Sequence, residues 1–242
     1  MSPAPRFTPI EQEEMILKAA TKCIEASSLM DFTMSSISKE CGLSMGSVYK
    51  HIQSKEDVLV ALATQMFQQL HHVFSQVLAL PIPAANRFVA IHLIDFEKAG
   101  LNSFDPLLET LVSNEAVLQR ASPGWLHKMI KIDESLEALF SQALLQQCQM
   151  GELDLPEQEF DEIVEEIQVG QWTLGVGFTQ VAMQRYSRHL VGKEVELPFP
   201  LHPQSTILKS ATRLMNSYPW KTPVTIEGLE KACELLKEKG LR

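Results

Sequence analysis

The segment from Thr33 to Ile52 contains two short helical patterns separated by a single glycine, and this arrangement strongly restricts the local fold. Thr33 can cap a first short helix that ends at Gly42, because glycine adopts the left-handed conformation without steric cost. Ser44 can then cap a second helix that runs to about Ile52. Two helices that meet at a steep angle through a tight glycine turn form a helix-turn-helix.

The residues inside this motif suit its packing. Ile37, Leu43 and Val48 supply apolar contacts where the helices touch, and Ser38 is small enough for a close approach of the backbones. The alternative is a tight helical hairpin inside a larger bundle. In such a hairpin the outward surface of the second helix would have no reason to avoid apolar residues. The second helix here does avoid them on that surface.

The rest of the chain also has helical periodicity, with no strand pattern or internal repeat. A long helix begins after Ser54 and keeps an apolar stripe to about Leu80, and further helices are predicted over 125–149, 157–190, 206–217 and 226–239. We therefore expect an all-α protein. Its predicted parts are a three-helix N-terminal domain (1–58), a helical domain reached through the long helix (59–222), and an amphipathic tail (223–242).

The second helix of the motif carries hydroxyl groups and cations on its outward surface. Hydroxyl groups can bond phosphates or base edges, and the side chains of Lys and His⁺ can bond phosphate oxygens. Lys55 stands at the start of the long helix, where peptide N–H groups favour a phosphate. The candidate DNA-binding residues are Thr33, Lys39, Ser44, Met45, Gly46, Ser47, Tyr49, Lys50, His51 and Lys55.

The formal net charge of −9 argues by itself against a nucleic-acid partner, because phosphate binding needs positive charge. The charges are segregated, however. From Thr33 to Lys55 there are three lysines and one glutamate, so a small positively charged surface lies on an acidic chain. We expect such a surface to bind duplex DNA through a few phosphate contacts per subunit.

Residues 33–59, TMSSISKECGLSMGSVYKHIQSKEDVL, resemble the tetracycline-repressor (TetR) family of bacterial transcriptional regulators. The resemblance implies a homodimer whose recognition helices enter successive major grooves of a near-palindromic operator. It implies that residues 1–58 form the DNA-binding domain and that residues 59–222 form a helical effector-binding and dimerisation domain. It also implies that Thr33, Tyr49, Lys50 and Lys55 hold phosphates, while Ser44, Met45 and Ser47 lie near base edges. The sequence departs from the family pattern at Ser38 and Cys41, where Ala is common, and at His51-Ile52, where an aromatic residue often follows.

Between Lys131 and Arg185 there is no Lys or Arg, while eleven Asp and Glu residues occur. This segment is either a solvated acidic surface that keeps DNA away, or part of a pocket for a neutral or cationic small-molecule effector. An anionic effector would instead need Arg87 or another cation nearby. Ligand sites are mostly apolar with a few polar anchors, which makes candidates of Trp125, Met129, Phe140, Glu165, Trp172 and Phe178. The apolar members of this set would equally suit an ordinary core.

Gly170, Gly175 and Gly177 fall within one predicted helix, where each costs about 1 kcal/mol relative to Ala. These glycines either allow close packing at a dimer interface or leave room for a ligand. We favour the dimer interface, to which the predicted helix over 206–217 would also contribute.

No catalytic or metal-binding spacing accompanies these features. There is no Glu-x-x-His pair, nucleophile elbow, Gly-rich phosphate loop or zinc spacing, and the four cysteines are scattered, so we expect no enzyme activity, cofactor or metal. No apolar run is long enough to span a membrane, which predicts a cytoplasmic protein without membrane contact. The sequence favours a dimeric, ligand-responsive transcriptional repressor. The alternative is a DNA-bound adaptor that responds to a partner protein, which a cavity too small for a metabolite would favour.

Overall fold

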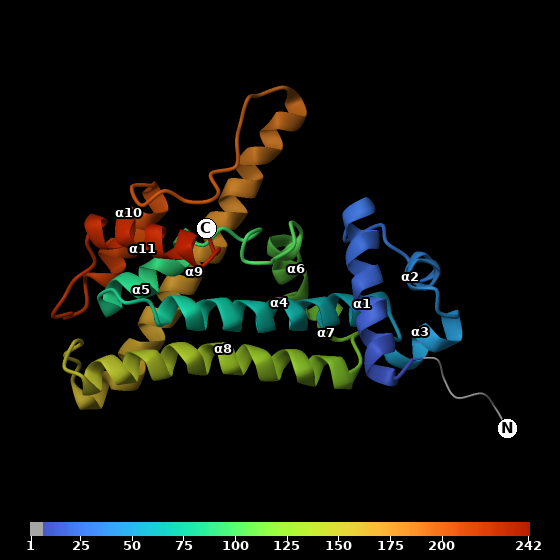
Figure 1. Cartoon of the computed structure of the whole chain (residues 1–242), viewed down its shortest axis with the longest axis horizontal. Helices are drawn as coiled ribbons and strands as arrows, with labels where there is room; N and C mark the ends of the chain where they lie inside the picture. The colour runs from blue at the N-terminus through green and yellow to red at the C-terminus, as the bar shows by residue number, and fades with distance from the viewer. Residues whose placement is uncertain (1–6) are drawn as a thin grey trace. The chain divides into compact units, whose positions relative to one another are not determined.

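The computed structural model describes residues 7–242, and within that range the chain forms helices and no strand, as the sequence predicts. Residues 1–6 of the predicted DNA-binding domain lie outside the described residues. Figure 1 shows the order of the α-helices. They are α1 (Pro9–Ala26), α2 (Met34–Cys41), α3 (Met45–His51), α4 (Lys55–Leu78), α5 (Ala84–Ala90), α6 (Asp105–Val112), α7 (Glu115–Leu118), α8 (Pro123–Gln149), α9 (Phe160–Tyr186), α10 (Thr206–Met215) and α11 (Ile226–Glu238). Three short 3₁₀ helices are η1 (Ile91–Leu93), η2 (Glu157–Glu159) and η3 (Ser187–Val191).

Local capping explains where the N-terminal helices begin. Thr8 and Glu11 form a reciprocal capping box at α1, with Pro9 at the first helical position. The Thr33 hydroxyl accepts a hydrogen bond from the Ser36 N–H at 3.0 Å, and the Ser36 hydroxyl accepts one from the Thr33 N–H. These side chains satisfy N–H groups that have no partner inside the helix.

The chain divides into two compact units, and each is built from segments that are distant in sequence. The first unit comprises the chain as far as Gln68 together with Leu107–Asp133, and the second comprises Gln69–Pro106 together with Glu134–Arg242. The predicted division placed its boundaries after residues 58 and 222. The long helices α4 and α8 each contribute residues to both units, so no one position in the sequence separates them.

The first unit has a core of side chains from α1, α2, α3 and the first half of α4. Phe32, Ile16, Ile37, Val48 and Ile52 are almost completely buried in it. Each fully buried side chain of this size contributes roughly 1.5–3 kcal/mol of hydrophobic free energy.

The second unit has a larger core in which α5, α10 and α11 pack together with α9 and the later turns of α4 and α8. The segment predicted as a separate tail belongs to this core, because Leu229, Ala232 and Leu236 of α11 are buried. Gly228 of α11 lies so close to the Asn86 side chain that a Cβ atom would clash with it. The side chain of Asn86 also donates a hydrogen bond to the Thr225 carbonyl oxygen.

Two of the three α9 glycines allow close packing inside the chain. A Cβ atom at Gly170 would lie 2.8 Å from Leu214 of α10, and one at Gly175 would lie 3.2 Å from the His92 ring. His92 is bonded to Gln171 at 2.9 Å, and burial lowers the pKa of its imidazole. Only Gly177 has no atom within 4 Å of a Cβ position, so the favoured dimer-interface role is left to Gly177 alone.

A search of the described helices for a membrane-spanning segment finds none that is both long and apolar enough.

Candidate DNA-binding surface and effector cavity

The turn between α2 and α3 depends on Gly42. Its φ is 69° and its ψ is 17°, the left-handed conformation that glycine adopts without strain, while no atom lies within 4 Å of a Cβ position. Glycine is therefore required at position 42 because of its backbone conformation, and not because a side chain would lack space. The Ser38 hydroxyl donates a hydrogen bond to the Leu43 carbonyl oxygen at 2.7 Å across this turn. Behind the turn, Ile37 and Val48 are completely buried and fix the angle between the two helices.

The outward surface of α3 carries polar side chains. Tyr49, Lys50 and Gly46 are exposed, and Tyr49 keeps 44% of its accessible surface. Ser44 caps the helix by accepting a hydrogen bond from the Ser47 N–H, and the two serine hydroxyls lie 3.0 Å apart. Ser47 and the adjacent Met45 are partly exposed. The helix thus presents hydroxyl groups and one lysine in the direction away from its core.

The lysines of this surface lack acidic partners. Within residues 7–242, neither Lys39 nor Lys50 forms an ion pair. The only acidic residue of the motif, Glu40, is bonded to Lys22 of α1 at 2.9 Å. The surface therefore has a positive potential, and anionic groups would neutralise it.

Two predicted DNA-contacting side chains are held against the protein. The His51 ring lies 3.3 Å from the Gln12 side chain of α1, so it faces that helix. The Lys55 ammonium group donates a hydrogen bond to the Met30 carbonyl oxygen at 3.4 Å and lies 4.9 Å from the centroid of the Phe32 ring. Lys55 lies at the first turn of α4, where peptide N–H groups attract anions.

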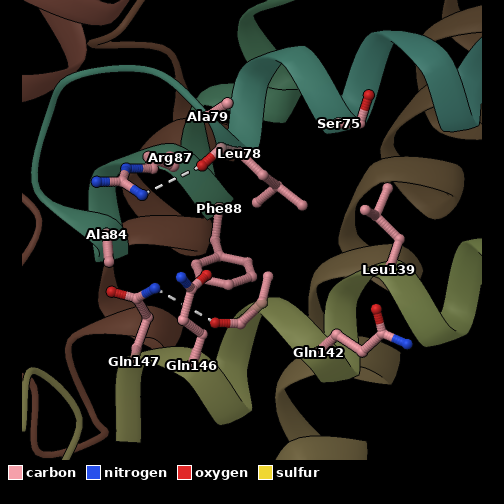
Figure 2. Close-up of a pocket in the computed structure, with 11 residues that line it drawn as sticks. Ser75, Leu78, Ala79, Ala84, Arg87, Phe88, Leu139, Gln142, Gln146 and Gln147 are labelled. Carbon is pink, nitrogen blue, oxygen red and sulfur yellow. Dashed lines mark hydrogen bonds between the residues drawn. The ribbon is translucent and has the colours of Figure 1, made fainter. Parts of the chain in front are cut away.

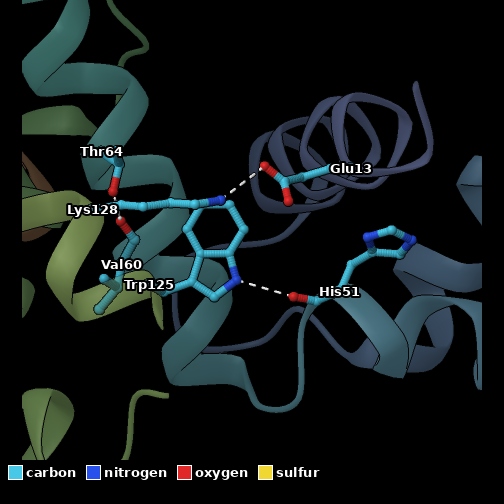
Figure 3. A network of polar contacts seen from close by, with 6 residues as sticks. All are labelled: Glu13, His51, Val60, Thr64, Trp125 and Lys128. Carbon is cyan, nitrogen blue, oxygen red and sulfur yellow. Dashed lines mark hydrogen bonds and ion pairs between the residues drawn. The ribbon is translucent and has the colours of Figure 1, made fainter. Parts of the chain in front are cut away.

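The end of α3 is also held by the start of α8, which the sequence did not indicate (Figure 3). The Trp125 indole N–H donates a hydrogen bond to the His51 carbonyl oxygen at 3.0 Å. Lys128 forms an ion pair with Glu13 of α1 at 3.3 Å, and its ammonium group lies 3.8 Å from the centroid of the Trp125 ring. We call Ser122, Trp125 and Lys128 the α8 clamp.

Ser122 completes the α8 clamp through Asp57 of α4. Asp57 is fully buried, and its carboxylate accepts hydrogen bonds from the Gln53 N–H at 2.8 Å and the Ser122 N–H at 2.5 Å. The Asp57 N–H in turn donates to the Ser54 hydroxyl that caps α4. The backbone between α3 and α4 is therefore fixed from both sides, which limits the orientations that α3 can adopt.

The second unit contains a cavity of about 440 Å³ between α4, α5 and α8 (Figure 2). Its apolar wall consists of Leu78, Ala79, Ala84, Phe88, Leu139 and Ala143. Its polar lining consists of Ser75, Arg87, Gln142, Gln146 and Gln147. This volume lies within the usual range for small-molecule sites. A second cavity, of about 490 Å³, lies between the loop at 151–155 and residues 219–221.

None of the residues predicted to contact an effector lines either of these two cavities. Trp125 and Met129 are buried in the first unit, because they pack beside the helix-turn-helix. Phe140 packs its ring against Phe88 and Phe74, behind the first cavity.

The other three predicted residues lie on α9. Glu165 and Trp172 are exposed there, and Phe178 packs against Phe199 with ring centroids 6.1 Å apart. None of the eleven acidic residues of the 131–185 segment lines the 440 Å³ cavity, which removes the reason for favouring a neutral or cationic effector there.

Comparison with known sequences connects this surface to a family. A sequence profile described as "Bacterial regulatory proteins, tetR family" matches residues 16–62, which include α2, α3 and the start of α4. No curated protein sequence matches the chain.

Three solved structures are similar in fold. GusR of Salmonella enterica has a TM-score of 0.55 at 14% identity, over 93% of this chain and 98% of that one. FadR of Bacillus subtilis, crystallised with stearoyl-CoA, has a TM-score of 0.53 at 14% identity, over 84% of this chain and 95% of that one. A superantigen named PfiT has a TM-score of 0.56 at 13% identity, over 89% of this chain and all of that one. At these identities the likeness concerns the fold alone.

Proposed function

We propose that this chain, whose residues 16–62 match the TetR-family profile, is a DNA-binding transcriptional regulator of that family and acts as a homodimeric repressor released from its operator by a small molecule. The observation that carries the proposal is the polar outward surface of α3. Lys50 of α3 and Lys39 of α2 form no ion pair with any residue in the range 7–242. In this proposal Thr33, Tyr49, Lys50 and Lys55 hold phosphates, and Ser44, Met45 and Ser47 read base edges. Gly46 keeps the backbone of α3 accessible to the groove.

The charges of this surface set the expected salt dependence. Three lysines per subunit give about six phosphate contacts per dimer, so the logarithm of the affinity should fall with a slope of about −5 against the logarithm of the salt concentration. Because His51 faces Gln12, we assign it a supporting role and not a phosphate contact.

The proposed dimer surface is the exposed apolar stripe of α9. Val169, Trp172 and Met183 recur at helical spacing on one side of the helix, and Trp172 keeps 55% of its accessible surface. Exposed apolar groups gathered in this way are typical of protein–protein contacts. The helix is acidic in its first turns and ends near Arg185, so an antiparallel pair would place opposite charges together.

The oligomeric state tests this surface directly. Val169→Glu should convert the dimer to a monomer in sedimentation equilibrium, because it places a charge in an apolar contact. Ile10→Glu makes the same change at a residue of α1 that is 73% exposed, and it should leave the dimer intact. A dimer that survives Val169→Glu would exclude this stripe as the interface.

The effector is proposed to act through α8. The first turns of this helix form the α8 clamp on the end of α3, and its later turns line the 440 Å³ cavity. A ligand that reorients α8 would change the hold on α3 and shift the population of dimers away from those whose recognition helices are about 34–36 Å apart. The presence of a cavity of metabolite size argues against the alternative of an adaptor regulated by a partner protein.

Selection of binding sites from a pool of random duplexes tests the proposed function. The proposal expects enrichment of a near-palindromic site with half-sites one helical turn apart. Tyr49→Ala should weaken binding to all duplexes by a similar factor, whereas Ser47→Ala should change which sites are enriched. A pool without enrichment, or equal affinity of both variants and the wild type for every duplex, would contradict the assignment.

A further inference from the structure

We propose that the effector of the 440 Å³ cavity is an organic anion with an apolar body, and that Arg87 binds its negative group. This inference rests on the proposed function and specifies the chemistry of its ligand.

The lining of the cavity contains one charged side chain. Arg87 of α5 is that residue, and neither Asp nor Glu accompanies it. The other polar groups are a serine hydroxyl and the amides of three glutamines, all uncharged. A chain with a net charge of −9 thus encloses a cavity whose only formal charge is positive.

The guanidinium group of Arg87 is oriented by the protein (Figure 2). Its Nε donates a hydrogen bond to the Ile82 carbonyl oxygen at 2.8 Å, and its Nη1 donates one to the Leu78 carbonyl oxygen at 3.2 Å. These bonds use two of its five N–H donors. The carbonyl groups of Leu78, at the end of α4, and Ile82, after it, therefore leave three N–H donors for another acceptor.

The charge of Arg87 has no counter-ion in the described part of the chain, since the ion pairs there involve other residues. Carbonyl oxygens are neutral and cannot compensate it. A half-buried cation with its orientation fixed and its charge uncompensated is suited to a carboxylate or phosphate, which its planar donors can bind in a bidentate manner.

The remaining lining specifies the rest of the ligand. Phe88, Leu78 and Leu139 offer an apolar surface, and the Phe88 ring continues into the ring cluster with Phe140 and Trp220. The Gln142 and Gln146 amides are exposed at the rim, where they can donate further hydrogen bonds to an anionic group. The ligand is therefore amphipathic, with its charge near Arg87 and its hydrocarbon part against Phe88.

Isothermal titration of the full-length protein with three matched probes tests this assignment. Octanoate should bind at least about tenfold more tightly than octanamide, and octylammonium should bind more weakly than either, because only the first places a negative charge beside Arg87. Arg87→Lys should retain part of the preference for octanoate, since it keeps the charge and loses the planar donors.

A second pair of variants avoids the risk that changes at Arg87 disturb the end of α4. Gln146→Glu puts a carboxylate at the rim and should weaken octanoate binding by about tenfold while leaving octanamide binding unchanged. Gln149→Glu makes the same change one turn further along α8, at an exposed residue outside the lining, and should leave both unchanged.

The inference is overturned if octanamide binds as well as octanoate, if neither binds, or if the two glutamate variants behave alike. Duplex binding by the ligand-free protein is measured separately. A protein that binds its selected duplex but not octanoate would refute this inference and leave the proposed function standing. A protein that binds octanoate but no duplex would refute the proposed function and leave the assignment of an anionic ligand standing.

Discussion

Replacing Trp125 by Phe removes the hydrogen bond that holds the last carbonyl group of α3. The indole N–H is 3.0 Å from the His51 oxygen, and Trp125 keeps only 6% of its accessible surface, so water cannot easily replace the bond. Leaving a buried carbonyl group without a partner costs about 1–3 kcal/mol. The smaller ring adds roughly 1 kcal/mol of lost apolar burial, which gives a total of about 2–4 kcal/mol.

Trp220 provides a matched control. It is similarly buried, at 8% exposure, but its indole N–H has no hydrogen-bond partner. Trp220→Phe therefore loses apolar burial without losing a hydrogen bond, and should cost about 1 kcal/mol or less. The difference between the two variants isolates the bond to His51.

Urea unfolding followed by far-ultraviolet circular dichroism gives the two free energies of unfolding. Amide hydrogen exchange in a peptide covering 45–58 reports on the end of α3 itself, where only Trp125→Phe should accelerate exchange. Equal destabilisation by the two variants, or unchanged exchange in this peptide, would refute the reasoning that the α8 clamp fixes α3.

Three further substitutions follow from single contacts. Asp57→Asn should destabilise the protein by about 2–3 kcal/mol in thermal unfolding, because the amide supplies one acceptor where the buried carboxylate serves two N–H donors. Gly170→Ala should cost about 1–3 kcal/mol through the 2.8 Å approach to Leu214, whereas Gly124→Ala, with open space around it, should be neutral or stabilising; equal effects would refute the packing argument. Burial lowers the pKa of His92, so the unfolded chain binds a proton at this residue more readily than the folded one, and the wild type should lose stability as the pH falls below about 6.5. His92→Gln should remove this loss. Identical slopes of Tm against pH for the two proteins would contradict this.

The features that the sequence predicted well are those decided by neighbouring residues. The helix starts at Thr8, Thr33 and Ser44 follow from side chains that satisfy N–H groups three residues away. The turn at Gly42 follows from the conformational freedom of one residue. Because these causes are local, periodicity and capping were sufficient to predict the helix-turn-helix.

The features that the sequence did not predict depend on contacts between distant segments. Trp125 was expected in an effector pocket, yet it bonds His51, which lies 74 residues earlier in the chain. The sequence shows that residue 125 is aromatic, but it does not show which group its indole N–H contacts. The cavity was missed for the same reason, since Arg87 and Gln147 come together only when α5 and α8 pack.

Composition alone did not determine the charge of the effector. The run of acidic residues before Arg185 suggested a site for a cation, but Glu165 and Glu166 are exposed on α9. A charge count along the sequence does not distinguish a solvated surface from a cavity wall, because neighbours on a helix point in different directions.

The central claim is that α3 presents its outward surface to the major groove. Photo-crosslinking tests it directly, with a benzophenone amino acid placed at Ser47 of α3 and, as a control, at Thr173 on the exposed side of α9. The account predicts that the Ser47 probe labels bases at two positions one helical turn apart in a selected duplex, while the Thr173 probe labels none. Labelling from Thr173 but not from Ser47 would contradict it.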